Sequence, residues 1–264
     1  MNKLLQNHFN DGVLRLTLAD DASRNSLSEG MMDELAAALS GADARKDVHV
    51  VIVASTGKAF SSGHNLKELT AHRSALDCGA AYFEKIFGMC AKLMMAIANH
   101  RCAVIAEVNG LASAAGCQLV ASCDLAYASP NATFCTPGVN IGLFCSTPMV
   151  ALSRSVGSKQ AMEMLLLGGV HDAAFAVQAG LLNGVIPKED LSNHVNGLAL
   201  KIAAKSQAAI GFGKRLFHDQ RQLDLAEAYN LASGIMVRNM LDGAACEGLD
   251  AFINKRQPLW PELV

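Results

Sequence analysis

The sequence predicts an α/β fold followed by a helical C-terminal part. Short apolar strands alternate with amphipathic helices over about the first 130 residues, and helical spacing of apolar residues dominates after that. Apolar residues make up 51% of the 264 residues and charged residues 17%, which favours a large buried core over disorder. Because no Pro/Gly/Ser-rich linker or repeat interrupts the chain, we expect one compact α/β domain with a helical appendage.

The expected strands and helices follow one another in a regular order. Asn10-Asp11-Gly12 is a turn sequence that joins two strands, 4–9 and 13–18, into a hairpin. Ser28 can cap a helix whose apolar residues recur at helical spacing through Leu39. Further strands are expected at 49–54, 103–108 and 124–128, and further helices at 81–99, 114–123, 148–156, 158–167, 172–180, 189–205, 207–219, 222–240 and 243–255.

Charge and cysteine usage exclude several function classes. The formal net charge of −2 and a pI near 6.4 argue against nucleic acid or an anionic membrane as the main partner. No apolar run approaches the length of a membrane span, and an N-terminus without signal or transit character predicts a cytoplasmic protein. The eight cysteines contain no Cys-x-x-Cys pair, so we expect no metal site and interpret them as reduced, mostly buried thiols.

Two segments rich in Gly, Ala and Ser, at 57–66 and 109–119, lie at junctions between strands and helices. Small residues let a ligand approach the main chain closely, and N–H groups at a helix start are donors for developing negative charge. Two such donors aimed at one oxygen form an oxyanion hole. Tight packing produces the same composition more often, and neither segment matches a dinucleotide or P-loop fingerprint, so the residues alone leave the role of these junctions open.

Four segments taken together resemble the signatures of one family. They are Gly-Lys-Ala-Phe-Ser-Ser-Gly-His-Asn-Leu-Lys-Glu-Leu at 57–69, Asn-Gly-Leu-Ala-Ser-Ala-Ala-Gly-Cys-Gln-Leu-Val-Ala-Ser-Cys-Asp at 109–124, Phe-Cys-Thr-Pro-Gly-Val-Asn-Ile-Gly-Leu at 134–143, and Gly-Leu-Asp-Ala-Phe-Ile-Asn-Lys-Arg at 248–256. Their order and spacing resemble the enoyl-CoA hydratase/isomerase (crotonase) superfamily over essentially the whole chain. Three segments also resemble one subgroup of that family: Ser-Ser-Gly-His at 61–64, Ala-Ala-Gly-Cys-Gln-Leu-Val-Ala-Ser-Cys-Asp at 114–124 and Gly-Leu-Phe-Cys-Ser-Thr-Pro at 142–148.

The resemblance implies a crotonase-like spiral of ββα units, with an α/β core over 1–200 and a C-terminal helical trimerisation region over 201–264. It also implies homotrimers, or hexamers built as dimers of trimers, that bind an acyl-CoA thioester. Coenzyme A is part of that substrate, so no separate cofactor is expected. The thioester oxygen would lie between two main-chain N–H groups, which the family pattern places at His64 and Ala115.

Further substrate contacts are implied by the same resemblance. The adenine and phosphate end of coenzyme A would lie near Arg24, Ser26, Leu66 and Lys67. A C-terminal lysine, Lys255, matches a family contact to phosphate, although a solvated surface lysine explains it nearly as well. The remaining expected contacts to the thioester or to coenzyme A are Ser62, Gly63, Asn65, Gly116 and Phe252.

Two residues depart from the family pattern. Family hydratases use two glutamates to hold and activate the water that adds to the double bond, and the pattern places them at Gln118 and Gly138. An amide does not take up a proton near neutral pH, and glycine has no side chain. Because general acid–base catalysis contributes about two to four orders of magnitude in rate per group, we expect hydration by this mechanism to be absent or very weak.

Three hypotheses for the reaction stay open. The protein is an enzyme of CoA thioesters without the water site, a true hydratase or isomerase that uses another group such as Glu107 or His64, or a non-catalytic acyl-CoA binder. A decarboxylase of the methylmalonyl-CoA type belongs to the first group, although Cys145 stands near the position of those enzymes' pocket tyrosine. A structural ion pair or a solvated position explains Glu107 more readily, and apolar neighbours favour packing roles for Cys117, Cys135 and Cys145.

Overall fold

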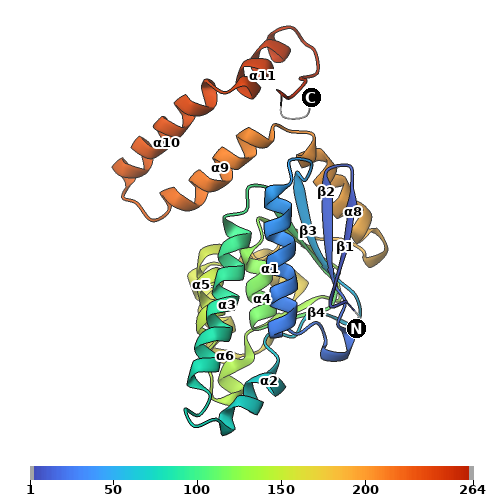
Figure 1. Ribbon diagram of the computed structural model, residues 1–264, viewed down its shortest axis with the longest axis vertical. Coiled ribbons are helices and arrows are strands. Elements are labelled where there is room, and N and C mark those ends of the chain that lie inside the picture. Colours follow the sequence, from blue (N-terminus) through green and yellow to red (C-terminus); the bar gives the residue numbers. More distant parts are fainter. Residues whose placement is uncertain (1–2, 262–264) are drawn as a thin grey trace.

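The computed structural model describes residues 3–261 and contains two sheets (Figure 1). The larger sheet has the order β1 (Leu5–Asn10), β2 (Val13–Leu18), β3 (Val50–Ser55), β5 (Ala103–Val108), β7 (Leu125–Ala128) and β10 (Gly184–Val185). The smaller sheet has the order β4 (Ala59–Ser61), β6 (Leu111–Ser113), β8 (Thr133–Cys135) and β9 (Val170–Asp172). Pairing is parallel except in the β1–β2 hairpin and the β8–β9 pair. All five strands expected from the sequence are confirmed and belong to the larger sheet.

Successive strands alternate between the two sheets. β3 joins the larger sheet and β4 the smaller, and the pairs β5–β6 and β7–β8 repeat the step, each followed by helical structure. This strand–strand–helix path is the spiral of ββα units that the family resemblance implied. The sequence analysis missed the strands of the smaller sheet, because a three-residue strand has no room for an alternation of apolar and polar residues.

Helices cover both faces of the larger sheet (Figure 1). One face carries three helices whose apolar residues share a core with strand residues such as Leu16 and Val53. The other face carries one helix, in which Val195 packs in the same core as Ile52 and Ile105. The first three helices are α1 (Glu29–Ala44), α3 (Ala80–Ala98) and α4 (Ala115–Ser122), and the helix on the opposite face is α8 (Lys188–Ala203).

Shorter helices surround the smaller sheet. Three of them, α5 (Ser146–Ser155), α6 (Ser158–Leu167) and α7 (Ala173–Ala179), were expected from the sequence; the bounds of α6 agree and those of the other two differ by one or two residues. The short helix α2 (Leu66–Ala71) was not expected, because six residues are too few to show helical periodicity. Three 3₁₀ turns complete this part: η1 (Asp21–Ser23), η2 (His72–Ser74) and η3 (Pro137–Ile141).

The last three helices, α9 (Gln207–Gln220), α10 (Leu225–Met240) and α11 (Gly243–Ile253), form an arm that extends beyond one end of the core (Figure 1). A buried side chain, Lys214 of α9, ties the arm to the core: its ammonium donates to the carbonyls of Ile97 and Cys102, both at 3.0 Å, and to the carboxylate of Asp124 at 2.7 Å. The boundary expected at 200 falls inside α8, three residues before that helix ends.

The arm presents many large apolar side chains to solvent in the single chain. They are Phe217, Leu225, Tyr229, Met236, Val237, Met240, Leu241, Leu249, Phe252 and Ile253. Within residues 3–261, no helix combines the length and the apolar character needed to cross a membrane. The apolar residues that make up 51% of the sequence thus lie partly in the core and partly on this exposed arm.

Candidate functional site

The candidate site lies where β4 and β6 end and α4 begins. Gly63 follows β4 in a left-handed conformation with φ +83°, and a Cβ added there would meet the Ser113 carbonyl oxygen at 2.8 Å and the Ala115 nitrogen at 3.2 Å. A side chain at position 63 would therefore be strained and would also displace main-chain atoms. The close contact places the peptide between Gly63 and His64 beside the first residue of α4.

The direction of the His64 N–H is fixed by the other end of its own peptide group. The carbonyl of Gly63 accepts a hydrogen bond of 2.8 Å from the Leu27 N–H. In a planar trans peptide the C=O and N–H point in opposite directions, so the His64 N–H points away from Leu27. The strand bridge between Leu27 and His64 holds this arrangement in place.

Ala115 opens α4 directly after a strained residue. Ala114 has φ +48° and ψ −114°, a conformation that costs a residue with a side chain about 1–3 kcal/mol and clusters at functional sites. The Ala114 carbonyl accepts from the Gln118 N–H at 3.0 Å, so the Ala115 N–H, at the other end of that peptide, points out of the helix start. Gly116 lies so close to β4 that a Cβ there would stand 2.3 Å from the Ser61 carbonyl oxygen. The structure thus brings together four expected residues: Gly63, His64, Ala115 and Gly116.

The meeting of Gly63 and His64 with the start of α4 is called the corner below. The His64 side chain lies beside this corner without a hydrogen-bond partner among residues 3–261. Both ring nitrogens are buried and unpaired, and the ring meets Phe87 edge to face with the two centroids 5.3 Å apart. Burial lowers the pKa of the imidazole, and an interaction with the Leu27 main chain, which falls short of hydrogen-bond geometry, offsets part of that shift, so the ring is neutral at pH 7. An unpaired buried polar group costs free energy that a ligand with a matching donor or acceptor would recover.

Gln118 and Gly138 are both buried, the first in α4 and the second in η3. The Gln118 side chain points into the core, where its Oε1 accepts a weak hydrogen bond from the Cys90 thiol at 3.8 Å. Gly138 lies in η3, and a Cβ there would meet the Leu143 carbonyl oxygen at 2.9 Å and the Cys145 Sγ at 3.0 Å. A glutamate at position 138 would therefore require this turn to rearrange.

Three buried thiols, Cys117, Cys135 and Cys145, lie within electrostatic reach of one another near the same corner. Burial raises the pKa of each thiol. All three are therefore protonated at neutral pH, the form that packs as a small hydrophobe and does not act as a nucleophile. No group of three or more His, Cys, Asp or Glu side chains in the described part of the chain could hold a metal ion.

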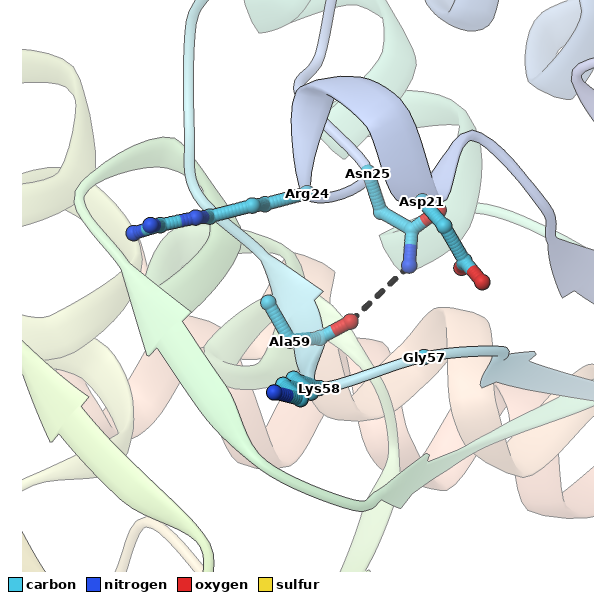
Figure 2. Close-up of a pocket in the computed structure, with 6 residues that line it drawn as sticks. All are labelled: Asp21, Arg24, Asn25, Gly57, Lys58 and Ala59. Carbon is cyan, nitrogen blue, oxygen red and sulfur yellow. Dashed lines mark hydrogen bonds between the residues drawn. The ribbon is translucent and has the colours of Figure 1, made fainter.

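A pocket of about 360 Å³ opens between the loop at η1 and the start of β4 (Figure 2). Asn25 lines this pocket, and its side-chain amide donates to the carbonyls of Ala59 at 2.8 Å and Thr56 at 3.0 Å. Both Arg24 and Asn25 have left-handed conformations, with φ +58° and +52°. Figure 2 shows the Arg24 guanidinium and the Asp21 carboxylate directed away from each other. The lining residues are Asp21, Arg24, Asn25, Gly57, Lys58 and Ala59.

The other expected contacts of the N-terminal half lie on the segments that join the pocket to the corner. Ser26 has a buried hydroxyl without a hydrogen-bond partner in residues 3–261, and the Ser62 hydroxyl donates to a main-chain carbonyl at 3.1 Å. Asn65 caps α2, since its Oδ1 accepts from the Lys67 N–H at 3.1 Å. Leu66 and Lys67 are exposed in the first turn of α2.

Phe252 and Lys255 lie apart from these residues. Phe252 is 84% exposed near the end of α11, and Lys255 follows that helix in a left-handed conformation with φ +52°. Figure 1 shows α11 at the far end of the arm, whereas β4 and α2 lie on the opposite side of the core. One chain therefore does not bring the two C-terminal residues to the corner at Gly63.

Glu107 is excluded as an acid or base of this corner. Its carboxylate accepts from the Arg15 guanidinium at 2.8 Å, and both side chains are largely buried. Because side chains alternate along a strand, Glu107 of β5 faces the same side as Ile105, which packs with α8 and not with α4. The structural ion pair that the sequence analysis favoured for Glu107 is confirmed, and its proposed use as a catalytic group is wrong.

Sequence reasoning missed two residues of the site region. Lys58 lines the pocket beside Arg24, and its place in the first signature segment was the signal that could have identified it. Ala114 makes the strained turn into α4, but an alanine gives no sequence signal of a positive φ.

Comparison with known proteins decides the family. The family model described as "Enoyl-CoA hydratase/isomerase" matches residues 8–262. The chain belongs to this family. A rat protein named "Enoyl-CoA hydratase domain-containing protein 3, mitochondrial" is 44% identical over 258 residues, which cover 98% of this chain and 84% of the relative. The human protein of the same name is 45% identical over 250 residues, which cover 95% of this chain and 81% of the relative. These relatives belong to the subgroup that the segment at 142–148 resembles.

Solved structures of the family have the same fold. The crystal structure of human enoyl coenzyme A hydratase domain-containing protein 3 superimposes with a TM-score of 0.92 at 44% identity. The match covers 97% of this chain and all of the other. A structure described as an enoyl-CoA hydratase from Mycobacterium smegmatis also has a TM-score of 0.92 at 44% identity and covers 97% of this chain and 98% of the other. The fold expected from the sequence is therefore confirmed over nearly its whole length.

Proposed function

We propose that this protein binds an acyl-CoA thioester and stabilises the enolate form of its acyl group through the main-chain N–H groups of His64 and Ala115. The contact of Gly63 with the start of α4 carries this proposal, because it sets the two peptides side by side. Each N–H points away from the carbonyl bond that anchors its own peptide, the direction from which a donor would hold the thioester oxygen. Membership of the family supports a thioester oxygen as that group.

The proposed reaction needs no carboxylate at positions 118 and 138. Gln118 does not accept a proton near neutral pH, and Gly138 has neither a side chain nor room for one. Addition of water by a pair of glutamates is therefore not the proposed reaction, although several relatives carry the word hydratase in their names. An oxyanion hole still lowers the energy of any path that passes through an enolate.

Decarboxylation of a malonyl-type thioester is the second candidate, and the His64 side chain favours it. Loss of CO₂ breaks the bond to the α-carbon and leaves its electron pair as the enolate, so no base has to remove a proton. A neutral imidazole has one N–H to donate. The unpaired His64 ring supplies such a donor beside the proposed thioester oxygen, where it would orient the carboxylate that leaves.

The pocket in Figure 2 is the proposed place for the phosphate end of coenzyme A. Arg24 and Lys58 supply two positive charges at its rim, against one carboxylate, Asp21. That carboxylate already accepts a hydrogen bond from the Thr56 hydroxyl at 2.6 Å. A guanidinium and an ammonium on one pocket suit a phosphate group, which takes charge-assisted hydrogen bonds from both.

The helical arm is proposed to join copies of this chain into homotrimers, alone or paired as hexamers. Its many exposed large apolar side chains are typical of a surface that another protein chain covers. In such an assembly Phe252 and Lys255 would contact coenzyme A bound to another copy, since they lie far from the site of their own chain. The cytoplasmic location expected from the sequence stays a prediction. The names of the rat and human relatives include the word mitochondrial, which differs from that prediction.

The test removes one main-chain donor. Ala115→Pro deletes the N–H at the first position of α4, and because the torsion angles of Ala114 and the contact with Gly63 disfavour proline there, circular dichroism and urea unfolding check that the variant is folded. Ser158→Pro makes the same deletion at the first position of α6, after Gly157 with ψ 142°, and is the control for a proline at a helix start. Butyryl-, crotonyl-, malonyl- and methylmalonyl-CoA are offered to each protein, with products read by mass spectrometry and binding by thermal unfolding.

We expect heat stabilisation by the thioesters, CO₂ loss from a malonyl-type substrate and no hydration of crotonyl-CoA. Loss of one oxyanion donor should lower turnover by about 10²- to 10³-fold in Ala115→Pro and leave Ser158→Pro unchanged. Stabilisation without any turnover favours the non-catalytic binder. The proposal fails if no thioester stabilises the wild-type protein, or if turnover survives Ala115→Pro intact.

A further inference from the structure

A main-chain hydrogen bond closes the turn from Gly138 to Cys145, and the Cys145 thiol packs against Gly138 within it. The Leu143 N–H donates to the Gly138 carbonyl at 2.9 Å. A Cβ on Gly138 would meet the Cys145 Sγ at 3.0 Å and the Cys145 nitrogen at 3.3 Å. The direction in which any side chain at position 138 would leave the main chain is therefore occupied by Cys145.

Contacts connect this thiol to the corner at α4. Cys145 caps α5, which packs against α4, and its side chain lies in the same apolar core as Ala115 and Cys117. The carbonyl of Cys135 accepts from the Ala114 N–H at 2.9 Å, and Cys117 lies two residues after Ala115 in the first turn of α4. The thiol of Cys145 therefore belongs to the packing that surrounds the proposed thioester site.

We call Gly138 and Cys145 together the wall. The polar groups that this wall offers differ from those of a site that binds water. Buried water needs two to four polar partners. A protonated thiol is a weak donor and a weak acceptor, and Gly138 adds no polar side-chain atom. A wall of this kind selects an acyl group by shape and apolar contact, and it gives a water molecule little to bind.

We propose that Cys145 is a specificity-determining residue, whose thiol takes the place of a side chain at position 138 and limits the size of the acyl group next to the thioester. This inference rests on the acyl-CoA binding proposed above and assigns the side chain that sets the acyl size. Cys145 is 8% exposed, so a small part of its surface remains open to a bound group.

The first experiment compares dissociation constants for acetyl-, butyryl- and hexanoyl-CoA and for free coenzyme A. Cys145→Ala removes the sulfur, so the ratio of hexanoyl to acetyl affinity should rise about tenfold, in line with what a methylene-sized space contributes in an apolar pocket. Cys145→Met should lower the same ratio. The dissociation constant for free coenzyme A should stay the same in both variants, because it has no acyl group.

The matched control is Cys102→Ala. Cys102 is a fully buried thiol whose Sγ donates to the Val48 carbonyl at 3.2 Å, at the other end of β5 from the candidate site. Its removal should leave the affinity ratio unchanged. An equal change of the ratio in Cys102→Ala, or no change in Cys145→Ala, would overturn the inference.

A second experiment uses the wild-type protein and does not depend on how a variant folds. Hydrogen–deuterium exchange of the peptide that contains Cys145, read by mass spectrometry, should slow in the presence of butyryl-CoA and not in the presence of free coenzyme A. A peptide from α8, on the opposite face of the larger sheet, serves as the internal reference. If butyryl-CoA binds but gives no protection, this inference is wrong and the proposed function stands. If no acyl-CoA binds, the proposed function itself is wrong.

Discussion

Replacing Lys214 by methionine should loosen the helical arm, because one ammonium makes three hydrogen bonds between α9 and the core. Methionine keeps most of the aliphatic length and removes the charge. The carbonyls of Ile97 and Cys102 then lose their donor, and the carboxylate of Asp124 loses its cation. The side chain of Lys214 is only 8% exposed, so water does not easily replace the ammonium.

The expected size of the effect follows from these partners. Removing one member of a buried ion pair costs about 3–5 kcal/mol. Asp124 is 22% exposed and keeps a hydrogen bond of 2.7 Å from the Val104 N–H, so its charge is not left without partners. We therefore expect the lower end of that range, about 3 kcal/mol of unfolding free energy.

Urea unfolding at a fixed protein concentration measures this loss, since the proposed assembly would make stability depend on concentration. Arg215→Met is the matched control: Arg215 is the next residue of α9, is 80% exposed and makes one pair with Asp219 at 3.5 Å. An exposed pair of this kind contributes about 0.2–1 kcal/mol at most. The reasoning is refuted if Lys214→Met stays within that small range or if both variants lose the same amount.

Three further predictions concern the site. Gly138→Ala should lower the unfolding free energy by about 1–3 kcal/mol in urea, since its Cβ overlaps the Leu143 carbonyl, and unchanged stability would contradict this. The unfolded chain takes up the His64 proton more readily than the folded one, so the wild type should lose stability relative to His64→Gln as pH falls below about 6.5, whereas parallel pH curves would exclude it. Arg24→Gln with Lys58→Gln should weaken coenzyme A about tenfold or more in calorimetry and leave pantetheine unaffected, because only the former carries phosphates.

Five of the six strands of the larger sheet were predictable from the sequence because they are long enough to show a pattern, whereas β10, with two residues, was missed. The segment 50–55, for example, is a run of apolar residues that forms a buried central strand. The smaller sheet consists of three-residue strands such as Ala59–Ser61, which have no pattern of their own and are fixed by their neighbours. Local sequence therefore predicts the layer that holds the core, and only the family resemblance implied the layer that holds the site.

The candidate site shows the same division. The close contacts of Gly63 and Gly116 agree with what small residues at a strand-to-helix junction predict. By contrast, nothing in the sequence of Ala114 predicts φ +48°, because tertiary contacts impose it. The packing of Cys145 against Gly138 was also beyond sequence reasoning, since it depends on how a turn closes between two residues that are seven positions apart.

The two N–H groups at the corner belong to the main chain, which has a consequence for how this protein tolerates mutation. Replacing the side chain of residue 64 or 115 leaves both donors in place, and only proline can delete one of them. Glycine is needed at position 63 to keep the two peptides in contact. Random substitution will therefore change the side chains around a carbonyl oxygen far more often than it removes the donors. Side-chain substitutions can therefore change the reaction that such a protein catalyses, or abolish it, while the geometry of the two main-chain donors stays the same.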